Sequence, residues 1–300
     1  MAGNGGKLPS VHDVPDVNQR APAVALRKVL DRHGHGFHYA LLQHIESLGV
    51  RGWSVEASEF PVATPDGHTH IDFVLRLRTE VALPLRLVAE CKRANPALID
   101  WCFVRVPRTP EPEIVALERV SLHPETFEAS AVVDRNRAFW SSDRIYGLGY
   151  PIRRHHGAKG NSDDASGGRT ALQDAVDQAV RGASGLIDFL CRRKELLVPP
   201  GLYGYVLPVV FTTARLWVSD VDLAAADLAT GDIPESDVKL IDWLWLKQNI
   251  SPGLKHSVTP GRGIPPSDLG RYVLQDYCRV IGIVSVAGVE DFLRIPYFHT

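Results

Sequence analysis

Residues 69–92 read THIDFVLRLRTEVALPLRLVAECK, and this stretch decides the fold. Apolar and polar residues alternate along both of its ends, over about 69–78 and 85–92, which is the pattern of half-buried strands. Pro84 stands directly before the second run and favours the close of a connection over a continued strand. The stretch therefore predicts an antiparallel hairpin.

Three polar side chains fall on one face of this hairpin. Asp72 on the first strand and Glu90 and Lys92 on the second share that face, because successive side chains point to opposite sides of a strand. The other face is apolar and consists of Ile71, Phe73, Leu75, Leu77, Leu85, Leu87, Ala89 and Cys91. If the apolar face packs on a core, the three polar residues emerge together.

The register of the hairpin adds a charge argument. A turn centred near Val81 places Asp72 directly across from Glu90, where opposed Cβ atoms are roughly 4.5–5.5 Å apart and like charges are destabilising. A divalent cation would offset that repulsion, and Mg²⁺ (or Mn²⁺) suits two carboxylates and one carbonyl with several retained waters. The backbone carbonyl of Cys91 is the candidate third ligand. Lys92 would orient an attacking water or offset charge on a scissile phosphate.

Helices and further strands flank the hairpin. Apolar residues recur at three- and four-residue intervals over 37–48, which predicts a helix that ends at Gly49. A strand over about 53–62 follows, and Asp66-Gly67 is typical of a tight hairpin turn. Later runs predict a long amphipathic helix over 171–190 and strands over 205–212, 215–218 and 280–286.

The aspartate and the Glu-x-Lys triplet together carry a family resemblance. With 17 residues between Asp72 and Glu90-Cys91-Lys92, the pattern resembles the PD-(D/E)xK nucleases. The order helix, three strands, helix, strand resembles the core of their restriction-endonuclease-like fold over about 120 residues. The resemblance implies an α/β fold with a mixed central sheet flanked by helices. It also implies Mg²⁺- or Mn²⁺-dependent hydrolysis of DNA phosphodiester bonds, with an endonuclease as the expected enzyme.

Two positions depart from the pattern of that family. Ile71 stands where many members have a proline, and His38 stands where many have a glutamate on the first helix. The accessory acidic metal ligand therefore stays open between Glu46, on the predicted helix, and Glu59, on the first predicted strand.

The resemblance further implies a polar group that the second helix presents to the site. Gln178 is the candidate, because it shares a polar face with Asp174 and Arg181 by helical spacing. Gln173 is the weaker alternative.

Composition divides the chain into three segments. Residues 1–25 contain glycine, proline and scattered charges with neither helical nor strand periodicity, and they are predicted to form a loose arm. Residues 26–220 are predicted to form the nuclease-like domain, with the proline- and arginine-rich stretch 94–168 inserted between its third strand and second helix. Residues 221–300 are predicted as an extension packed on the same domain. Its Trp243-Leu244-Trp245 run is expected in a core or interface rather than against bases.

The length, composition and net charge of the chain exclude several classes of protein. The 300 residues are 45% hydrophobic, enough for a packed core, and no window approaches a membrane span or a secretory signal, so a soluble cytoplasmic protein is expected. The four cysteines, Cys91, Cys102, Cys191 and Cys278, form no C-x-x-C pair. A net charge of −2 gives no global basic field, so any DNA contact must use local patches.

Other interpretations of the same residues stay open. Asp72, Glu90 and Lys92 would also suit a surface ladder of salt bridges, and the histidine pairs 33/35, 68/70 and 155/156 would suit zinc, although no third ligand has a diagnostic spacing. The predicted insertion carries cations that suit either phosphate contacts or a solvated loop: Arg135, Arg137, Arg144, Arg153, Arg154, Lys159 and Arg169. The cations at 192–194 are interpreted as stabilising the end of the long helix.

A nuclease without a motor or a sequence-reading module needs another means of restraining its cleavage activity. We therefore expect a homo-oligomer, or a partner ATPase or targeting subunit, in a defence or repair assembly, by analogy alone. The alternative from another class is a non-catalytic nucleic-acid-binding or assembly subunit that retains the nuclease fold.

Overall fold

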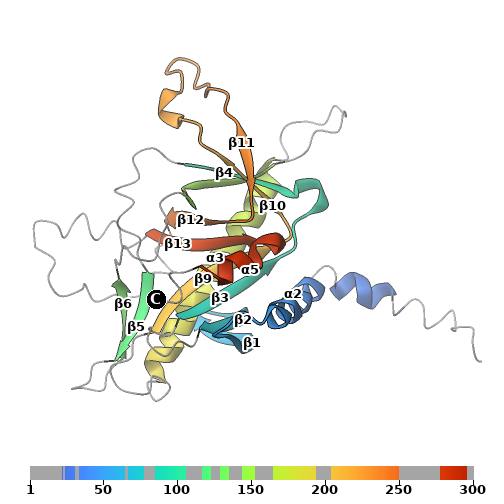
Figure 1. Cartoon of the computed structure of the whole chain (residues 1–300), viewed down its shortest axis with the longest axis vertical. Helices are drawn as coiled ribbons and strands as arrows, with labels where there is room; N and C mark the ends of the chain where they lie inside the picture. Colours follow the sequence, from blue (N-terminus) through green and yellow to red (C-terminus); the bar gives the residue numbers. More distant parts are fainter. Residues whose placement is uncertain are drawn as a thin grey trace, which may run out of the picture.

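The computed structural model in Figure 1 describes residues 22, 24–30, 34–64, 67–77, 85–105, 117–122, 129–134, 144–152, 165–193, 204–249 and 278–295. Its helices are α2 (His35–Leu48), α3 (Ala165–Arg192) and α5 (Val289–Leu293), with short 3-10 turns at η2 (Pro96–Leu98), η7 (Leu223–Ala225) and η10 (Val286–Gly288). The strands are β1 (Trp53–Thr64), β2 (Gly67–Leu77), β3 (Leu85–Lys92), β4 (Asp100–Val104), β5 (Leu117–Leu122), β6 (Ala129–Asp134), β7 (Ile145–Tyr146), β8 (Leu148–Ile152), β9 (Gly204–Thr212), β10 (Arg215–Ser219), β11 (Val238–Ile241), β12 (Trp243–Asn249) and β13 (Cys278–Ser285).

The hairpin predicted from residues 69–92 is confirmed in β2 and β3. The two strands are antiparallel, and their pairing runs from Phe73 opposite Ala89 to Leu77 opposite Leu85. This is the register expected for a turn near Val81. At the other end of β2, Gly67 pairs with Thr64 of β1, so Gly67 belongs to the strand and the connection lies at residues 65 and 66, outside the described residues.

The main sheet is mixed, which confirms the expected α/β class. Its strand order is β1-β2-β3-β9-β13-β12-β7, and β5 pairs with β9 and β6. β3, β9 and β13 run parallel, whereas β2 is antiparallel to both of its neighbours, β1 and β3. All nine residues of β9 are buried, as expected of a strand covered on both faces.

Helices α2 and α5 cover one face of this sheet. The apolar side of α2 contributes Leu41, Leu42 and Ile45 to a core that includes alternate residues of β2, β3 and β9, such as Phe73. Gly49 ends α2 in the left-handed conformation that glycine adopts without strain, with φ 55°, as its position in the sequence predicts. This packing fixes the first turn of α2 near the carboxyl end of β3.

Helix α3 covers the opposite face and approaches it closely. A Cβ atom at Gly185 would lie 2.6 Å from Val62 and 2.9 Å from the carbonyl oxygen of Ala63. One at Gly182 would lie 3.0 Å from both Ile71 and Val88. These two glycines let α3 lie directly on β1, β2 and β3.

The prediction that the hairpin has one apolar and one polar face was wrong. Val74 and Val88, on the expected polar face, are buried against α3, and Arg86 is only 4% exposed. Glu56 is the partner of this buried guanidinium and accepts two of its hydrogen bonds, at 2.7 and 3.0 Å. Both faces are covered, so polar groups reach solvent only where the strands end.

A second sheet extends the fold beside α3, with the order β11-β10-β4-β8. Its strands come from residues 94–168 and from beyond β9, and Trp101 and Phe103 of β4 join Leu216 of β10 in a core with α3. Residues 94–168 also supply β5, β6 and β7 to the main sheet, and residues 221–300 supply β12 and β13. The two segments that the sequence sets apart therefore contribute strands to both sheets.

Several predictions fall outside the described residues. These are the structure of 1–21 within the N-terminal arm and the contacts of Arg135, Arg137, Arg153, Arg154, Lys159 and Arg169. Trp245 is 1% exposed and lies in the main core, which confirms its expected role. Among the described residues, no helix is long and apolar enough to span a membrane.

Candidate active site

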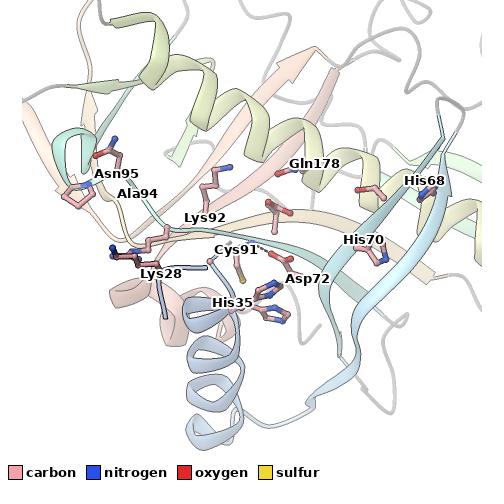
Figure 2. Close-up of a pocket in the computed structure, with 16 residues that line it drawn as sticks. Lys28, His35, His68, His70, Asp72, Cys91, Lys92, Ala94, Asn95 and Gln178 are labelled. Carbon is pink, nitrogen blue, oxygen red and sulfur yellow. Dashed lines mark hydrogen bonds between the residues drawn. The ribbon is translucent and has the colours of Figure 1, made fainter. Parts of the chain in front are cut away.

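A cavity of about 1060 Å³ opens at the carboxyl end of β3, between α2 and α3. It is lined by the residues that the sequence assigned to a site, Asp72, Glu90, Cys91, Lys92 and Gln178, together with Lys28, Gly34, His35, His38, His68, Thr69, His70, Arg93, Ala94, Asn95 and Pro96. Figure 2 shows Lys92 and Gln178 on the α3 side of the cavity and Asp72 and His35 on the α2 side. The chain thus brings together residues that are up to 150 positions apart in the sequence, from Lys28 to Gln178.

Asp72 is held by the neighbouring strand. The backbone N–H of Cys91 donates to Oδ2 of Asp72 at 2.6 Å, just beyond the last β2–β3 pair, Phe73 with Ala89. Burial raises the pKa of the Asp72 carboxyl, and the Cys91 hydrogen bond offsets part of that rise. Its charge is therefore fixed in place but poorly solvated.

Glu90 is the most perturbed carboxyl of the cavity. Burial, and then the charge of Asp72, raises the pKa of Glu90 to about 8, while Lys92 acts in the opposite direction. Among the described residues, no hydrogen-bond donor reaches the Glu90 carboxylate. Two carboxyl groups that repel each other in a poorly solvated site favour either a shared proton or a cation.

Cys91 contributes its backbone and not its thiol. Burial, and then the Asp72 charge, raises the pKa of the Cys91 thiol well above its usual value, so the sulfur stays protonated. In a strand, the N–H and C=O of one residue point to the same neighbour. Because the Cys91 N–H points to Asp72, its carbonyl faces the same edge, as a third oxygen ligand requires.

The salt-bridge alternative applies to a different part of the hairpin. Glu56 binds Arg86 at 2.7 Å and Arg76 at 3.4 Å, at the end of the strands far from the cavity. Within the described parts of the chain, no ion pair shorter than 4 Å joins Lys92 to Asp72 or Glu90. The cavity therefore holds unneutralised acidic groups with a cation nearby.

The candidates for the accessory acid differ in position. Glu46 is exposed on α2 and does not line the cavity. Glu59 lies 3.0 Å from Nδ1 of His38 and 3.6 Å from Nδ1 of His35, and its charge raises the pKa of Asp72. Glu59 is thus the acid that belongs to the surroundings of Asp72.

The two candidate glutamines of α3 also differ in position. Gln178 lines the cavity with an exposed side chain. Gln173 donates instead to Asp177 on the same helix at 2.9 Å. Gly182, one turn beyond Gln178, allows the close helix packing that places Gln178 over the end of β3.

Histidines form the part of the site that the sequence did not predict. His35 and His38 lie in the first turn of α2 and, with Glu59, have ligand atoms within 4.8 Å of one another. His68 and His70 line the cavity but belong to no group of three possible metal ligands among the described residues, and residues 33, 155 and 156 lie outside the described residues. The available signal was His38 itself, at the helix position where many PD-(D/E)xK proteins have an acid.

The remaining cations have mixed roles. Lys28 and Arg93 line the cavity with Lys92 and bring positive charge to its mouth. Arg144 is occupied elsewhere, because its guanidinium lies 4.2 Å from the Trp243 ring centre and donates to the Trp243 carbonyl. Arg193 likewise packs on a ring, that of Phe189, near the end of α3.

Comparisons with known proteins identify no relative of this chain. No protein-family model matches the chain, and neither a curated protein nor a solved structure matches it significantly.

Proposed function

We propose that this chain is a metal-dependent phosphodiesterase of the PD-(D/E)xK kind that hydrolyses DNA. One observation carries the proposal: Asp72, Glu90, Cys91 and Lys92 converge in one open cavity, where the Glu90 carboxyl has a pKa of about 8. A strongly perturbed acid with a specific charged neighbour in a cleft is characteristic of a functional site. The order α2, β1, β2, β3, α3, β9 also supports the resemblance to the restriction-endonuclease-like core.

The donor set fits Mg²⁺ or Mn²⁺. Asp72, Glu90 and the carbonyl of Cys91 offer oxygen atoms, which these small cations prefer, and the open cavity leaves room for the waters they retain. The repulsion that raises the pKa of Glu90 becomes attraction when a divalent cation lies between the carboxylates. Such a cation, when bound, polarises the phosphoryl oxygens and offsets developing negative charge.

The protein's own groups account for the rest of the chemistry. Lys92 projects into the cavity two residues beyond Glu90, where its ammonium holds an attacking water in line or neutralises the phosphate. Gln178 faces it from α3 and orients the same groups by hydrogen bonding. Lys28 and Arg93 provide phosphate contacts at the mouth of the cavity.

Plasmid cleavage tests this function. The purified chain is incubated with plasmid DNA in Mg²⁺, Mn²⁺ or EDTA, beside Asp72→Ala and Lys92→Ala. Cleavage is expected in either metal, none in EDTA, and a loss of about 10³-fold for Asp72→Ala and about 10²-fold for Lys92→Ala.

Asp174→Asn is the matched control, because Asp174 is exposed on α3 one turn before Gln178 and does not line the cavity. Equal cleavage by the wild type and by both variants would exclude the assigned site. Binding of DNA without cleavage, at every metal tested, would favour the non-catalytic binding subunit.

A further inference from the structure

The α2 side of the cavity contains a buried histidine that the proposed hydrolysis does not use. His38 is 2% exposed, and neither of its ring nitrogens makes a hydrogen bond to any of the described residues. Its ring is stacked between Tyr39 and Phe73, at centroid distances of 4.7 and 5.7 Å, so its orientation is fixed. A buried polar group without a partner is energetically unfavourable, so its presence needs an explanation.

The contact between His38 and Glu59 is short without being a hydrogen bond. Nδ1 of His38 lies 3.0 Å from Oε1 of Glu59, yet the angles do not satisfy a hydrogen bond. Two atoms bound to one ion at about 2.0–2.2 Å lie roughly 3–3.5 Å apart and point at the ion instead of at each other. The geometry of this pair therefore matches that of two ligands of one cation.

Glu59 reaches this position through an unfavourable backbone conformation. It has φ 48°, the only positive φ of a non-glycine residue in the described part of the chain. Its neighbours Ser58 and Phe60 pair with Phe73 and Ile71, so Glu59 lies opposite Asp72 in the register of β1 and β2. Left-handed backbone at such a residue is unfavourable and is retained where the surroundings require it.

His35 completes a set of three ligands. It lies three residues before His38, on the same face of α2, with Nδ1 3.6 Å from Oε1 of Glu59. Histidine binds metal ions through a ring nitrogen, so both side chains can act as ligands. We infer that His35, His38 and Glu59 form a binding site for a transition-metal cation of the zinc type, beside the Asp72–Glu90 centre.

The chemistry of the ligands defines the cation. Two imidazole nitrogens and one carboxylate suit Zn²⁺, Co²⁺ and related ions, whereas Mg²⁺ and Ca²⁺ prefer oxygen ligands alone. Three protein ligands in an open cavity leave a position for water or a phosphate oxygen. This site is separate from the proposed oxygen-ligand centre, and its occupancy does not depend on whether the chain cleaves DNA.

The test measures metal binding and not cleavage. Tag-free protein is titrated with Zn²⁺ by calorimetry and with Co²⁺ by its ligand-field absorption. One equivalent is expected to bind to the wild type, with affinity reduced at least about 100-fold in His35→Ala and in Glu59→Gln. Both residues are partly exposed, at 46% and 37%, so these variants should fold, which thermal melting verifies. Excess Mg²⁺ should not displace the ion.

Three control variants separate the alternatives. His68→Ala removes a histidine that lines the cavity outside the cluster, Cys91→Ser removes the nearby thiol, and Glu90→Gln alters the other centre; each should bind Zn²⁺ as the wild type does. Absence of saturable Zn²⁺ binding would overturn the inference. So would an equal loss in His68→Ala, Cys91→Ser or Glu90→Gln, because the ion would then lie elsewhere. An inactive protein that still binds Zn²⁺ through His35 and Glu59 would refute only the nuclease proposal.

Discussion

Two of the described carboxylates, Asp100 in the second sheet and Glu90 in the cavity, have opposite surroundings. In the second sheet, Asp100 is 5% exposed and accepts hydrogen bonds from Arg215 and from the Trp217 indole, both at 2.7 Å. In the cavity, Glu90 is partly buried beside Asp72, and its pKa is raised to about 8. The first carboxylate is neutralised by the protein, whereas the second is not.

This difference separates a carboxylate that belongs to the fold from one that the proposed function would use as a metal ligand. Burying a charge is costly unless it is paired, so Asp100 and Arg215 are best explained as parts of the fold. Among the described residues Glu90 has no hydrogen-bond donor, which makes folding less favourable, and the proposed cation would offset that cost. Charge alone does not distinguish the two centres, but the partners around each carboxylate do.

The largest expected effect comes from Glu90→Gln, which preserves shape and removes the charge. DNA cleavage should fall about 10³-fold, because a ligand to the cation is lost. The free energy of unfolding without metal should stay equal or rise, since an unpaired acid is replaced by an amide. Plasmid cleavage and urea unfolding measure the two quantities. Cleavage at the wild-type rate would remove the distinction between the two centres.

Asp100→Asn should have the reverse effect. Removing the charge of the buried partner in this part-buried pair is expected to lower the free energy of unfolding by about 2 kcal/mol, while the cleavage rate of the folded fraction stays unchanged. Asp220→Asn is the control, because its pair with Arg105 is exposed and should contribute less than about 1 kcal/mol. A stability loss no larger than that of the control would contradict the role given to Asp100.

Stability without metal should depend on pH through Glu90. The folded chain holds a proton with a pKa of about 8 that the unfolded chain releases near 4.5, so stability falls as pH rises between these values. The loss should be at least about 1 kcal/mol, and it should be smaller in Glu90→Gln. Denaturant melts of both proteins across that range, in EDTA, make the measurement. Parallel pH profiles would show that Glu90 titrates normally.

The smallest effect concerns the glutamines of α3. Gln178→Ala removes one neutral hydrogen bond to the reacting groups, so cleavage should slow about 2- to 12-fold. Gln173→Ala should leave the rate unchanged, because Gln173 is bound to Asp177 outside the cavity. Initial rates at saturating DNA compare the two variants, and equal losses would remove Gln178 from the site.

Much of the site could be predicted because its central residues are close in sequence. The stretch from Thr69 to Lys92, which forms most of the β2–β3 hairpin, is only 24 residues long. The alternation of apolar and polar residues, together with one turn position, sufficed to predict its register. The polar face was predicted wrongly, since alternation cannot reveal that α3 covers Val74 and Val88. Burial on both faces depends on a helix about a hundred residues away.

The local elements, and the hairpin that carries Asp72, Glu90 and Lys92, could be predicted from the sequence alone. The reason is that the spacing of apolar residues and the residue types at turns act over a few residues. Only the tertiary structure decided which groups meet there. Parallel pairing of β3 with β9 and the close packing of α3 bring Gln178 to the cavity, and the unusual backbone at Glu59 brings its carboxylate to His38. These contacts arise from long-range packing, which no local pattern records.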